Sequence, residues 1–198
     1  MRKNITVLLL AFTLISGCGG GDTSTGDSPK GGGDNHSNLE QGKGRTDGKY
    51  KLWDYIVPKT DTTNNFIETK GGETNSYKTT YSIASSTVTE ISDYAKDEKT
   101  IYTKKADRIT VSFTKDDTPN GSYDLHLTAN LKDSVTIKEA TCKLIEHHAS
   151  IKINEKTFTD VIEIQCSDKP GYYQRDVGEV AQTKLGSNSS RSVRVLSN

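Results

Sequence analysis

The chain has 198 residues, of which 31% are hydrophobic, and its 26 basic residues balance its 26 acidic residues. No stretch concentrates Lys and Arg, which argues against a nucleic-acid partner, since proteins that bind nucleic acids cluster these residues. Beyond the N-terminal region, no apolar run approaches the ~20 residues that a transmembrane helix needs. This length and composition indicate one ordinary domain with an economical core.

Residues 1–17 have the parts of an export signal. Two basic residues follow the initial methionine, an apolar run spans 5–15, and the tetrapeptide ISGC occupies 15–18. The run is too short to cross a bilayer as a stable helix. The tetrapeptide resembles the lipobox of bacterial lipoproteins, and this resemblance implies cleavage before Cys18 and lipidation of that residue. Because Gly19 rather than an aspartate follows, resemblance to the sorting signal of two-membrane bacteria implies delivery to the outer membrane.

The segment after the cysteine has the composition of a flexible tether. Residues 19–49 are rich in Gly, Ser and Asp, and Leu39 is their one large apolar residue. Such a segment buries too little surface to offset its ordering entropy. We therefore expect a lipoprotein signal peptide at 1–17, the lipidated cysteine with its tether at 18–49, and a single β-rich domain at 50–198. The lipid would anchor the chain to a membrane of the cell envelope.

The predicted domain opens with the aromatic segment 50–57, which ends at Pro58. Its large rings predict a first strand packed on the core. Trp53 and Tyr55 are also a candidate binding surface for an envelope protein or a glycan, because the segment directly follows the tether.

Two segments, 108–115 and 123–131, alternate apolar and polar residues as half-buried strands do. The turn-rich sequence DDTPNG lies between them, so we predict an antiparallel hairpin with one wet face. The interior face is expected to hold Ile109, Val111, Phe113, Leu125, Leu127 and Ile162. The wetter face is expected to hold Thr110, Ser112, Asp124 and His126.

The C-terminal part continues the β pattern. Segment 142–153 fits a helix or a strand, and we favour a strand because β-rich segments surround it. Segments 157–166 and 191–196 predict two further strands. The expected fold is mainly β, with a curved antiparallel sheet or incomplete barrel and one short helix, and a β-sandwich is the alternative.

A resemblance supports this fold. The runs TFTDVIEI at 157–164 and GYYQRDVGEV at 171–180 resemble a signature of uncharacterised β-rich envelope lipoproteins: an aromatic-x-Asp-Val-Ile strand, a short loop, and Tyr-Tyr-x-x-x-Val-Gly-x-Val. The resemblance implies a strand that turns and returns as its partner, with Gly178 where a side chain would obstruct packing or at a bulge. It implies no catalytic residues.

The cysteines that remain after Cys18 form an even pair in an exported domain. Cys142 and Cys166 lie in predicted neighbouring strands, so we predict a disulfide that stabilises the domain by about 3 kcal/mol. Two buried thiols are the alternative. A zinc site that adds His147 and His148 has the right ligand types. The spacing argues against it, because adjacent residues of a strand point to opposite faces. We expect one inner histidine, one exposed histidine, no metal and no cofactor.

The sequence contains no Gly-x-Ser-x-Gly elbow, His-Glu-x-x-His motif or P-loop, so we assign no catalytic residues. We expect a non-enzymatic envelope lipoprotein with a binding or structural role and an unidentified ligand. The alternatives are an envelope enzyme acting on glycan or peptide, and a carrier of an apolar ligand. An apolar cavity would favour the carrier, a polar cleft with two close carboxylates would favour the enzyme, and a closed core with surface aromatics would favour the binding module.

Overall fold

The computed structural model describes residues 40–44, 49–137, 140–184 and 192–197. Cys18, the predicted signal peptide and most of the predicted tether lie outside the described residues. The described part is mainly β. Its strands are β1 (Glu40–Lys43), β2 (Tyr50–Lys51), β3 (Thr62–Lys70), β4 (Glu73–Ala84), β5 (Thr87–Ser92), β6 (Glu98–Lys104), β7 (Arg108–Lys115), β8 (Thr118–His126), β9 (Thr128–Ala129), β10 (Ser134–Ile137), β11 (Ala140–Ile153), β12 (Lys156–Cys166), β13 (Lys169–Gln174), β14 (Gly178–Lys184) and β15 (Ser192–Leu196).

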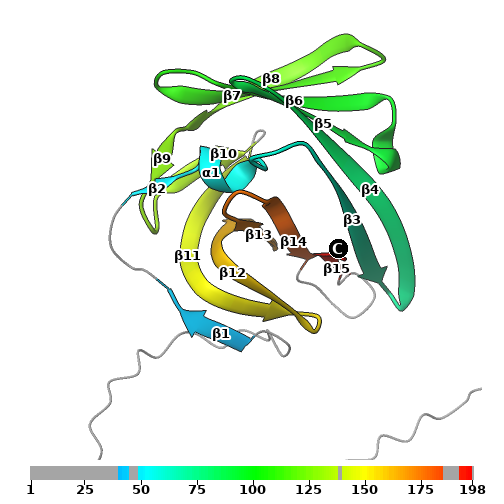
Figure 1. The fold of residues 1–198 in the computed structure, drawn as a ribbon. Coiled ribbons are helices and arrows are strands. Elements are labelled where there is room, and N and C mark those ends of the chain that lie inside the picture. The colour runs from blue at the N-terminus through cyan, green and yellow to red at the C-terminus, as the bar shows by residue number, and fades with distance from the viewer. Residues whose placement is uncertain (1–39, 45–48, 138–139, 185–191, 198) are drawn as a thin grey trace, which may run out of the picture. The chain divides into compact units, whose positions relative to one another are not determined.

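One antiparallel sheet contains most of these strands. Its order is β1-β11-β12-β13-β14-β15-β3-β4-β5-β6-β7-β8, and β10 pairs with the start of β11. The strand β10 also lies beside β8, the last strand of this order, so the sheet curves round until it is nearly closed (Figure 1). Strands β2 and β9 form a separate small pair. The predicted curved antiparallel sheet is therefore confirmed.

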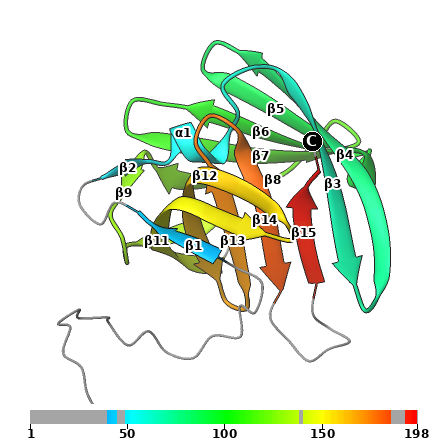
Figure 2. The same cartoon turned by 60° about the horizontal axis from the view of Figure 1, so that its bottom comes forward.

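The hairpin of β11 and β12 bends sharply, and Figure 1 shows both strands as a U beside β13 and β14. Two irregularities accompany the bend. The pairing of the two strands shifts after Leu144, and Asp160 has a φ of +51°. Figure 2 shows β1 along the outer edge of β11, where the pairing begins with Glu40 opposite Lys152. The sheet therefore begins inside the predicted tether, because main-chain hydrogen bonding at an open strand edge does not depend on side-chain composition.

The predicted hairpin at 108–131 forms as β7 and β8, with a shorter turn than expected. The turn is made by Asp116 and Asp117, with φ values of +50° and +60°, as two-residue hairpin turns require. Pro119 already pairs with Thr114 in the ladder. The proline is tolerated because β8 is the last strand of the sheet order, where a ladder donor is dispensable.

The aromatic segment 50–57 differs from its prediction. Only β2 is extended, and the helix α1 (Trp53–Ile56) follows it. The backbone N–H of Ile56 donates to the carbonyl of Leu52 at 2.9 Å. One helical turn brings Leu52, Tyr55 and Ile56 to the same side, so all three are buried at once, which an extended strand could not achieve. A second short helix, the 3-10 turn η1 (Asp93–Ala95), connects β5 to β6.

The predicted interior face, which combines residues of the β7–β8 hairpin with Ile162 of β12, is confirmed. Four of its residues are buried in one core cluster, and Phe113 and Leu127 pack against that cluster while partly exposed. The four are Ile109, Val111, Leu125 and Ile162. On the opposite face, Asp124 and His126 are exposed, and Thr110 and Ser112 are half-buried.

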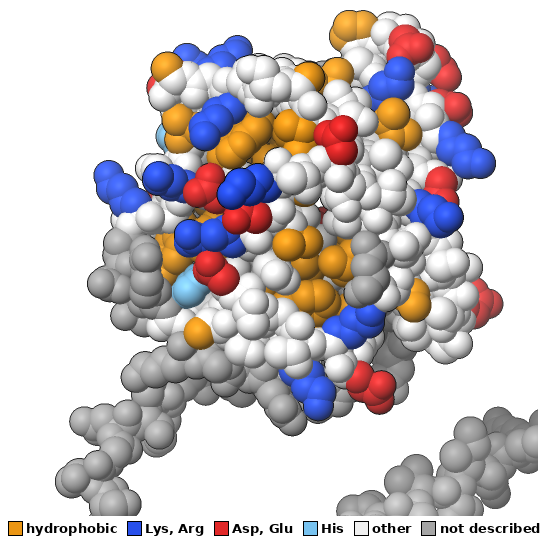
Figure 3. Space-filling view, viewed as in Figure 1, with side chains coloured by type: hydrophobic (Ala, Val, Ile, Leu, Met, Phe, Trp, Pro, Cys, Tyr) orange, Lys and Arg blue, Asp and Glu red, His pale blue; other side chains and the backbone are white. Residues whose placement is uncertain are grey.

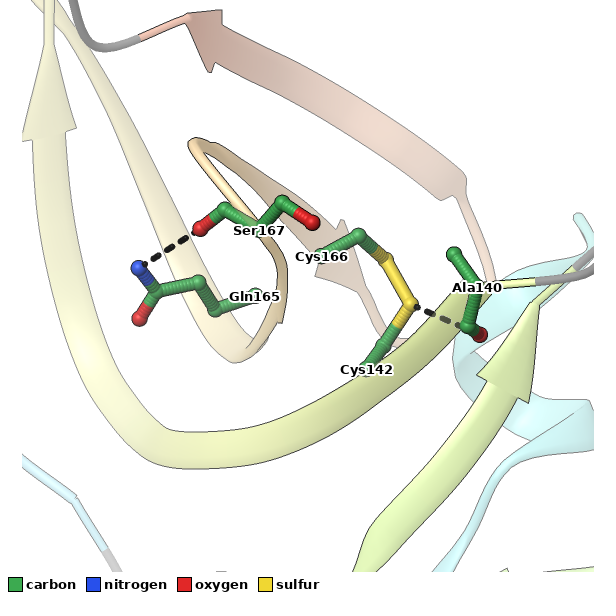
Figure 4. The surroundings of a disulfide bond; sticks show 5 residues. All are labelled: Ala140, Cys142, Gln165, Cys166 and Ser167. Carbon is green, nitrogen blue, oxygen red and sulfur yellow. Dashed lines mark hydrogen bonds between the residues drawn. A yellow bond between two sulfur atoms is a disulfide. The ribbon is translucent and has the colours of Figure 1, made fainter.

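The predicted disulfide between Cys142 and Cys166 is also confirmed, and it joins β11 to β12 with Cα atoms 4.3 Å apart (Figure 4). The neighbouring pair in the ladder is Lys143 with Gln165. Cys142 is fully buried and belongs to the same core cluster as the β7–β8 hairpin. Within the described ranges, no helix is long and apolar enough to span a bilayer.

Candidate functional site

A cavity of about 300 Å³ lies on the concave side of the curved sheet. Its wall combines strands from both halves of the sheet with one residue of α1. The wall contains five aromatic rings, two carboxylates and one guanidinium. The lining residues are Ile56, Tyr81, Glu90, Thr100, Tyr102, Phe113, Tyr123, Leu125, Ile137, Tyr173, Glu179, Gln182 and Arg194.

The pairing of β4, β5 and β6 brings a carboxylate together with two tyrosines. Tyr81 on β4 pairs directly with Glu90 on β5. Tyr102 on β6 pairs with Val88, two residues before Glu90, so its side chain lies on the same face. The Tyr102 hydroxyl donates to Glu90 Oε2 at 2.9 Å. Strand alternation therefore builds this polar corner of the cavity.

Tyr81, Tyr102 and Tyr173 are neutral hydrogen-bond donors at neutral pH. Burial, together with the charge of Glu90, raises the pKa of Tyr81 and of Tyr102 well above its ordinary value. Burial and the charge of Glu179 do the same to the pKa of Tyr173. Their hydroxyls can orient a ligand without adding charge to the wall.

An ion pair forms another part of the wall. Arg194 on β15 contacts Glu179 on β14, and its guanidinium lies 5.6 Å from the ring centre of Phe66 and 5.9 Å from that of Tyr77. Burial lowers the pKa of Arg194 to about 10, while the charge of Glu68 acts against that shift. Arg194 therefore keeps its charge at neutral pH. The lining carries two carboxylates and one guanidinium, which leaves one net negative charge.

A second, more open pocket of about 450 Å³ shares two residues with the cavity. These are Phe113 and Tyr123, whose rings stack with centres 5.7 Å apart. The ladder between β7 and β8 shifts at Phe113, between Ser112 and Thr114. A bulge changes the direction of a side chain locally. Here the bulge lies at Phe113, one of the two rings that both pockets share.

A polar cluster fastens α1 to the sheet. The carboxylate of Asp160 accepts from the Tyr55 hydroxyl at 2.8 Å and contacts His147 Nε2 at 2.7 Å. Arg175 Nε lies 2.8 Å from the same carboxylate, and its guanidinium carbon lies 5.0 Å from the ring centre of Tyr55. Figure 3 shows basic, acidic and histidine side chains side by side in the left half of the view.

This cluster changes the interpretation of the candidate binding surface. Tyr55 is fully buried, and burial raises its pKa to about 12 although the hydrogen bond from Arg175 lowers it. Trp53 is half-buried, packs against the core and has the Lys104 ammonium 5.6 Å from its ring centre. The buried Tyr55 therefore serves the packing of α1. For the half-buried Trp53, a binding surface stays a prediction.

The two histidines also differ from expectation. Both His147 and His148 are buried, with exposed fractions of 8% and 0%. They do point to opposite sides of β11, but each side is covered: His147 lies against Tyr50, and His148 lies against Tyr172. Each imidazole contacts one carboxylate, Asp160 and Glu163 respectively. The zinc set of two thiols and two imidazoles is not assembled, because the thiols form the disulfide.

Sequence reasoning missed the residues that line the cavity. The alternation of large and polar residues along segment 77–83 marks a face that includes Tyr81, but nothing in one strand shows which other strand faces it. Glu90 lines the same cavity as Glu179 and Arg194, although about half of the chain separates them in sequence. No family model matches the sequence, and no curated protein or solved structure matches it either.

Proposed function

We propose that this domain is a binding protein that holds a compact organic cation in the cavity of its curved sheet. The observation that carries the proposal is the lining itself: five aromatic rings surround a space with one net negative charge. Curved, closed sheets of about eight strands or more are known to enclose one small ligand. A volume of about 300 Å³ lies at the lower end of the usual range for small-molecule pockets, which favours a ligand smaller than a typical drug.

The chemistry of the wall supports a ligand with a positively charged nitrogen. The faces of aromatic rings attract cations, and sites that recognise quaternary ammonium groups use several rings together. Tyr81 and Tyr102 supply such rings next to Glu90, and Tyr123 adds a further ring to the lining. The mixture of rings and charged groups favours this ligand over a purely apolar one, because covering charged groups with an apolar ligand removes their hydration at a cost in free energy.

The stacked pair of Phe113 and Tyr123 is the proposed entrance. These two rings line both the cavity and the open pocket beside it. Both residues are half-buried. Rotation of one ring about its side-chain torsions would join the two spaces without moving the sheet.

Isothermal titration calorimetry with choline tests the proposal, and its uncharged carbon analogue 3,3-dimethylbutanol is the matched probe. We expect choline to bind at least tenfold more tightly than the alcohol. Glu90→Gln should remove this preference, whereas Glu73→Gln, an exposed change on β4 away from the cavity, should retain it. Equal affinity for both probes would contradict the cationic ligand, and hydrolysis of glycan or peptide substrates by the protein would favour the enzyme alternative.

We also propose that the protein is a lipid-anchored component of the cell envelope, at the outer membrane of a two-membrane bacterium. The support is the sequence ISGC at 15–18 after a short apolar run, followed by a polar segment. Cys18→Ser should release the protein from the membrane fraction. An unmodified Cys18 in the membrane-bound protein, detected by intact-mass analysis, would contradict the anchor.

A further inference from the structure

Three potential metal ligands meet on the β11–β12 hairpin, away from the cavity. Glu146 on β11 pairs directly with Glu163 on β12, and His148 follows two residues after Glu146 on the same strand. One carboxylate oxygen of each glutamate and one imidazole nitrogen all lie within 4.8 Å of one another. Side chains at alternate positions of a strand share a face, so the backbone pairing brings these groups together.

The cluster places two like charges opposite each other beside a buried imidazole. Directly opposed like charges destabilise a strand pair, and a buried carboxylate is costly without a counter-charge. Glu163 is only 7% exposed and His148 is fully buried. His148 Nε2 lies 3.1 Å from Glu163 Oε2. One imidazole alone compensates two carboxylates poorly, whereas a divalent cation would neutralise both.

A second observation comes from the neighbouring strands. Tyr172 on β13 pairs directly with Glu163 and is fully buried, yet its hydroxyl has no hydrogen-bond partner among the described residues. His148 Nδ1 is likewise buried without a partner, and the Thr183 hydroxyl, which lies beside that of Tyr172, also has no partner in hydrogen-bond geometry. Unpaired buried polar atoms are rare in folded proteins and indicate a bound water or ion.

We propose that Glu146, His148 and Glu163 bind a divalent transition-metal ion of the zinc type. One imidazole and two carboxylates form a ligand set that zinc accepts, and three protein ligands leave one position for water. Around a tetrahedral ion with bonds of ~2.1 Å, ligand atoms lie about 3.4 Å apart. The 3.1 Å between His148 and Glu163 is already close to that separation. Tyr172 and Thr183 would then hydrogen-bond the metal-bound water or the ligating carboxylates.

The exposure of the ligands gives the ion a route to the site. Glu146 is exposed, whereas the other two ligands are buried. An ion can therefore reach Glu146 from solvent, and small rotations of this long side chain are enough to complete the ligand set. The site would link β11 to β12 at a second place besides the disulfide, because Glu146 and Glu163 pair just beyond the irregularity after Leu144.

The test uses the full-length protein, freed of metal by a chelator and titrated with ZnCl2 in a calorimeter. We expect one equivalent to bind with a dissociation constant in the micromolar range or below. Glu146→Gln removes one charged ligand at an exposed position, so the fold is retained, and zinc affinity should fall at least tenfold. Glu155→Gln, an exposed change in the turn of the same hairpin, is the matched control and should leave the affinity unchanged.

A thermal melt provides a second readout. Zinc should raise the melting temperature of the wild-type protein and of Glu155→Gln, and this shift should be lost in Glu146→Gln. Absence of one-to-one binding, or equal affinity of wild type and Glu146→Gln, would overturn the proposal, since the ion would then be held elsewhere. Binding of Ca²⁺ but not Zn²⁺ would also overturn it, because calcium prefers oxygen ligands alone.

Discussion

The hydroxyl of Tyr55 in α1 donates a hydrogen bond of 2.8 Å to Asp160 in β12, although 105 residues separate the two in sequence. Arg175 completes the contact, since its Nη2 donates to the Tyr55 hydroxyl at 2.7 Å and its Nε lies 2.8 Å from the Asp160 carboxylate. The hydroxyl therefore both donates and accepts. This triangle fixes α1 against the sheet, and Ile56 of the same helix lines the cavity.

Tyr55→Phe removes the hydroxyl and keeps the ring. The change leaves Asp160 and Arg175 with one fewer partner each, and hydrogen bonds to charged groups contribute roughly 1.5–3 kcal/mol. We expect the free energy of unfolding, measured by urea denaturation, to fall by about 2 kcal/mol. Tyr94→Phe is the control, because Tyr94 is 80% exposed, and it should leave the stability unchanged. An unaltered midpoint for Tyr55→Phe would show that the triangle does not hold the helix.

The same cluster predicts a dependence of stability on acid pH. Partial burial raises the pKa of Asp160, but hydrogen bonds from His147 and Tyr55 and the charge of Arg175 outweigh it, so the pKa is lowered. The folded state then binds fewer protons than the unfolded state near the ordinary aspartate pKa of ~3.9. The contribution of Asp160 is therefore present above that pH and is lost as the pH falls through the folded-state pKa.

Melting temperatures recorded from about pH 7 to about pH 2.5 test whether the contribution of Asp160 to stability is lost as the pH falls. The wild-type curve should fall below about pH 4, and Asp160→Asn should be less stable at neutral pH and fall less steeply. Asp97→Asn, a change at an exposed carboxylate, should retain the wild-type slope. A steeper acid loss in Asp160→Asn than in wild type would mean that the sign is wrong.

The disulfide predicts a loss of stability on reduction. Cys142 and Cys166 are 24 positions apart, and closing a loop of ~25 residues stabilises by about 3 kcal/mol in the chain-entropy model. We expect the double variant Cys142→Ala/Cys166→Ala to lose roughly this amount in urea denaturation. Peptide mapping without reductant should find one linked peptide in the wild-type protein. Two alkylated thiols in the non-reduced protein would contradict the bond.

Local alternation was enough to predict the β7–β8 hairpin and its buried face from sequence. The period of two in Ile109, Val111 and Phe113 needs no knowledge of the partner strand. The segment 50–57 was predicted as a strand because aromatic residues favour strands. The structure instead buries Leu52, Tyr55 and Ile56 together through a helical turn, and that gain depends on a sheet face built from residues far along the chain.

Pairs of distant residues were beyond sequence reasoning for the same reason. Cys142 and Cys166 could be paired because cysteines in an exported chain are few and have one strong chemical preference. Glu90, Glu179 and Arg194 have many possible partners, and only the order of the strands decides which of them meet. The buried state of His148 likewise depends on β13, the next strand of the sheet, whose Tyr172 ring lies against the imidazole.

The last prediction compares the two faces of β7 and β8. Ile109 is fully buried and belongs to the core cluster, so Ile109→Ala should lower the free energy of unfolding by about 2–5 kcal/mol. His126→Ala should change it by less than about 0.5 kcal/mol, because His126 is exposed on β8. Phe113→Ala should cost less than the roughly 3–5 kcal/mol of a fully buried phenylalanine, since Phe113 is half-buried and lines both pockets. Urea denaturation of the three variants gives this ranking. If His126→Ala were the most destabilising of the three, the assignment of inner and outer faces would have to be reversed. Phe113 and Leu125 would then not line the cavity.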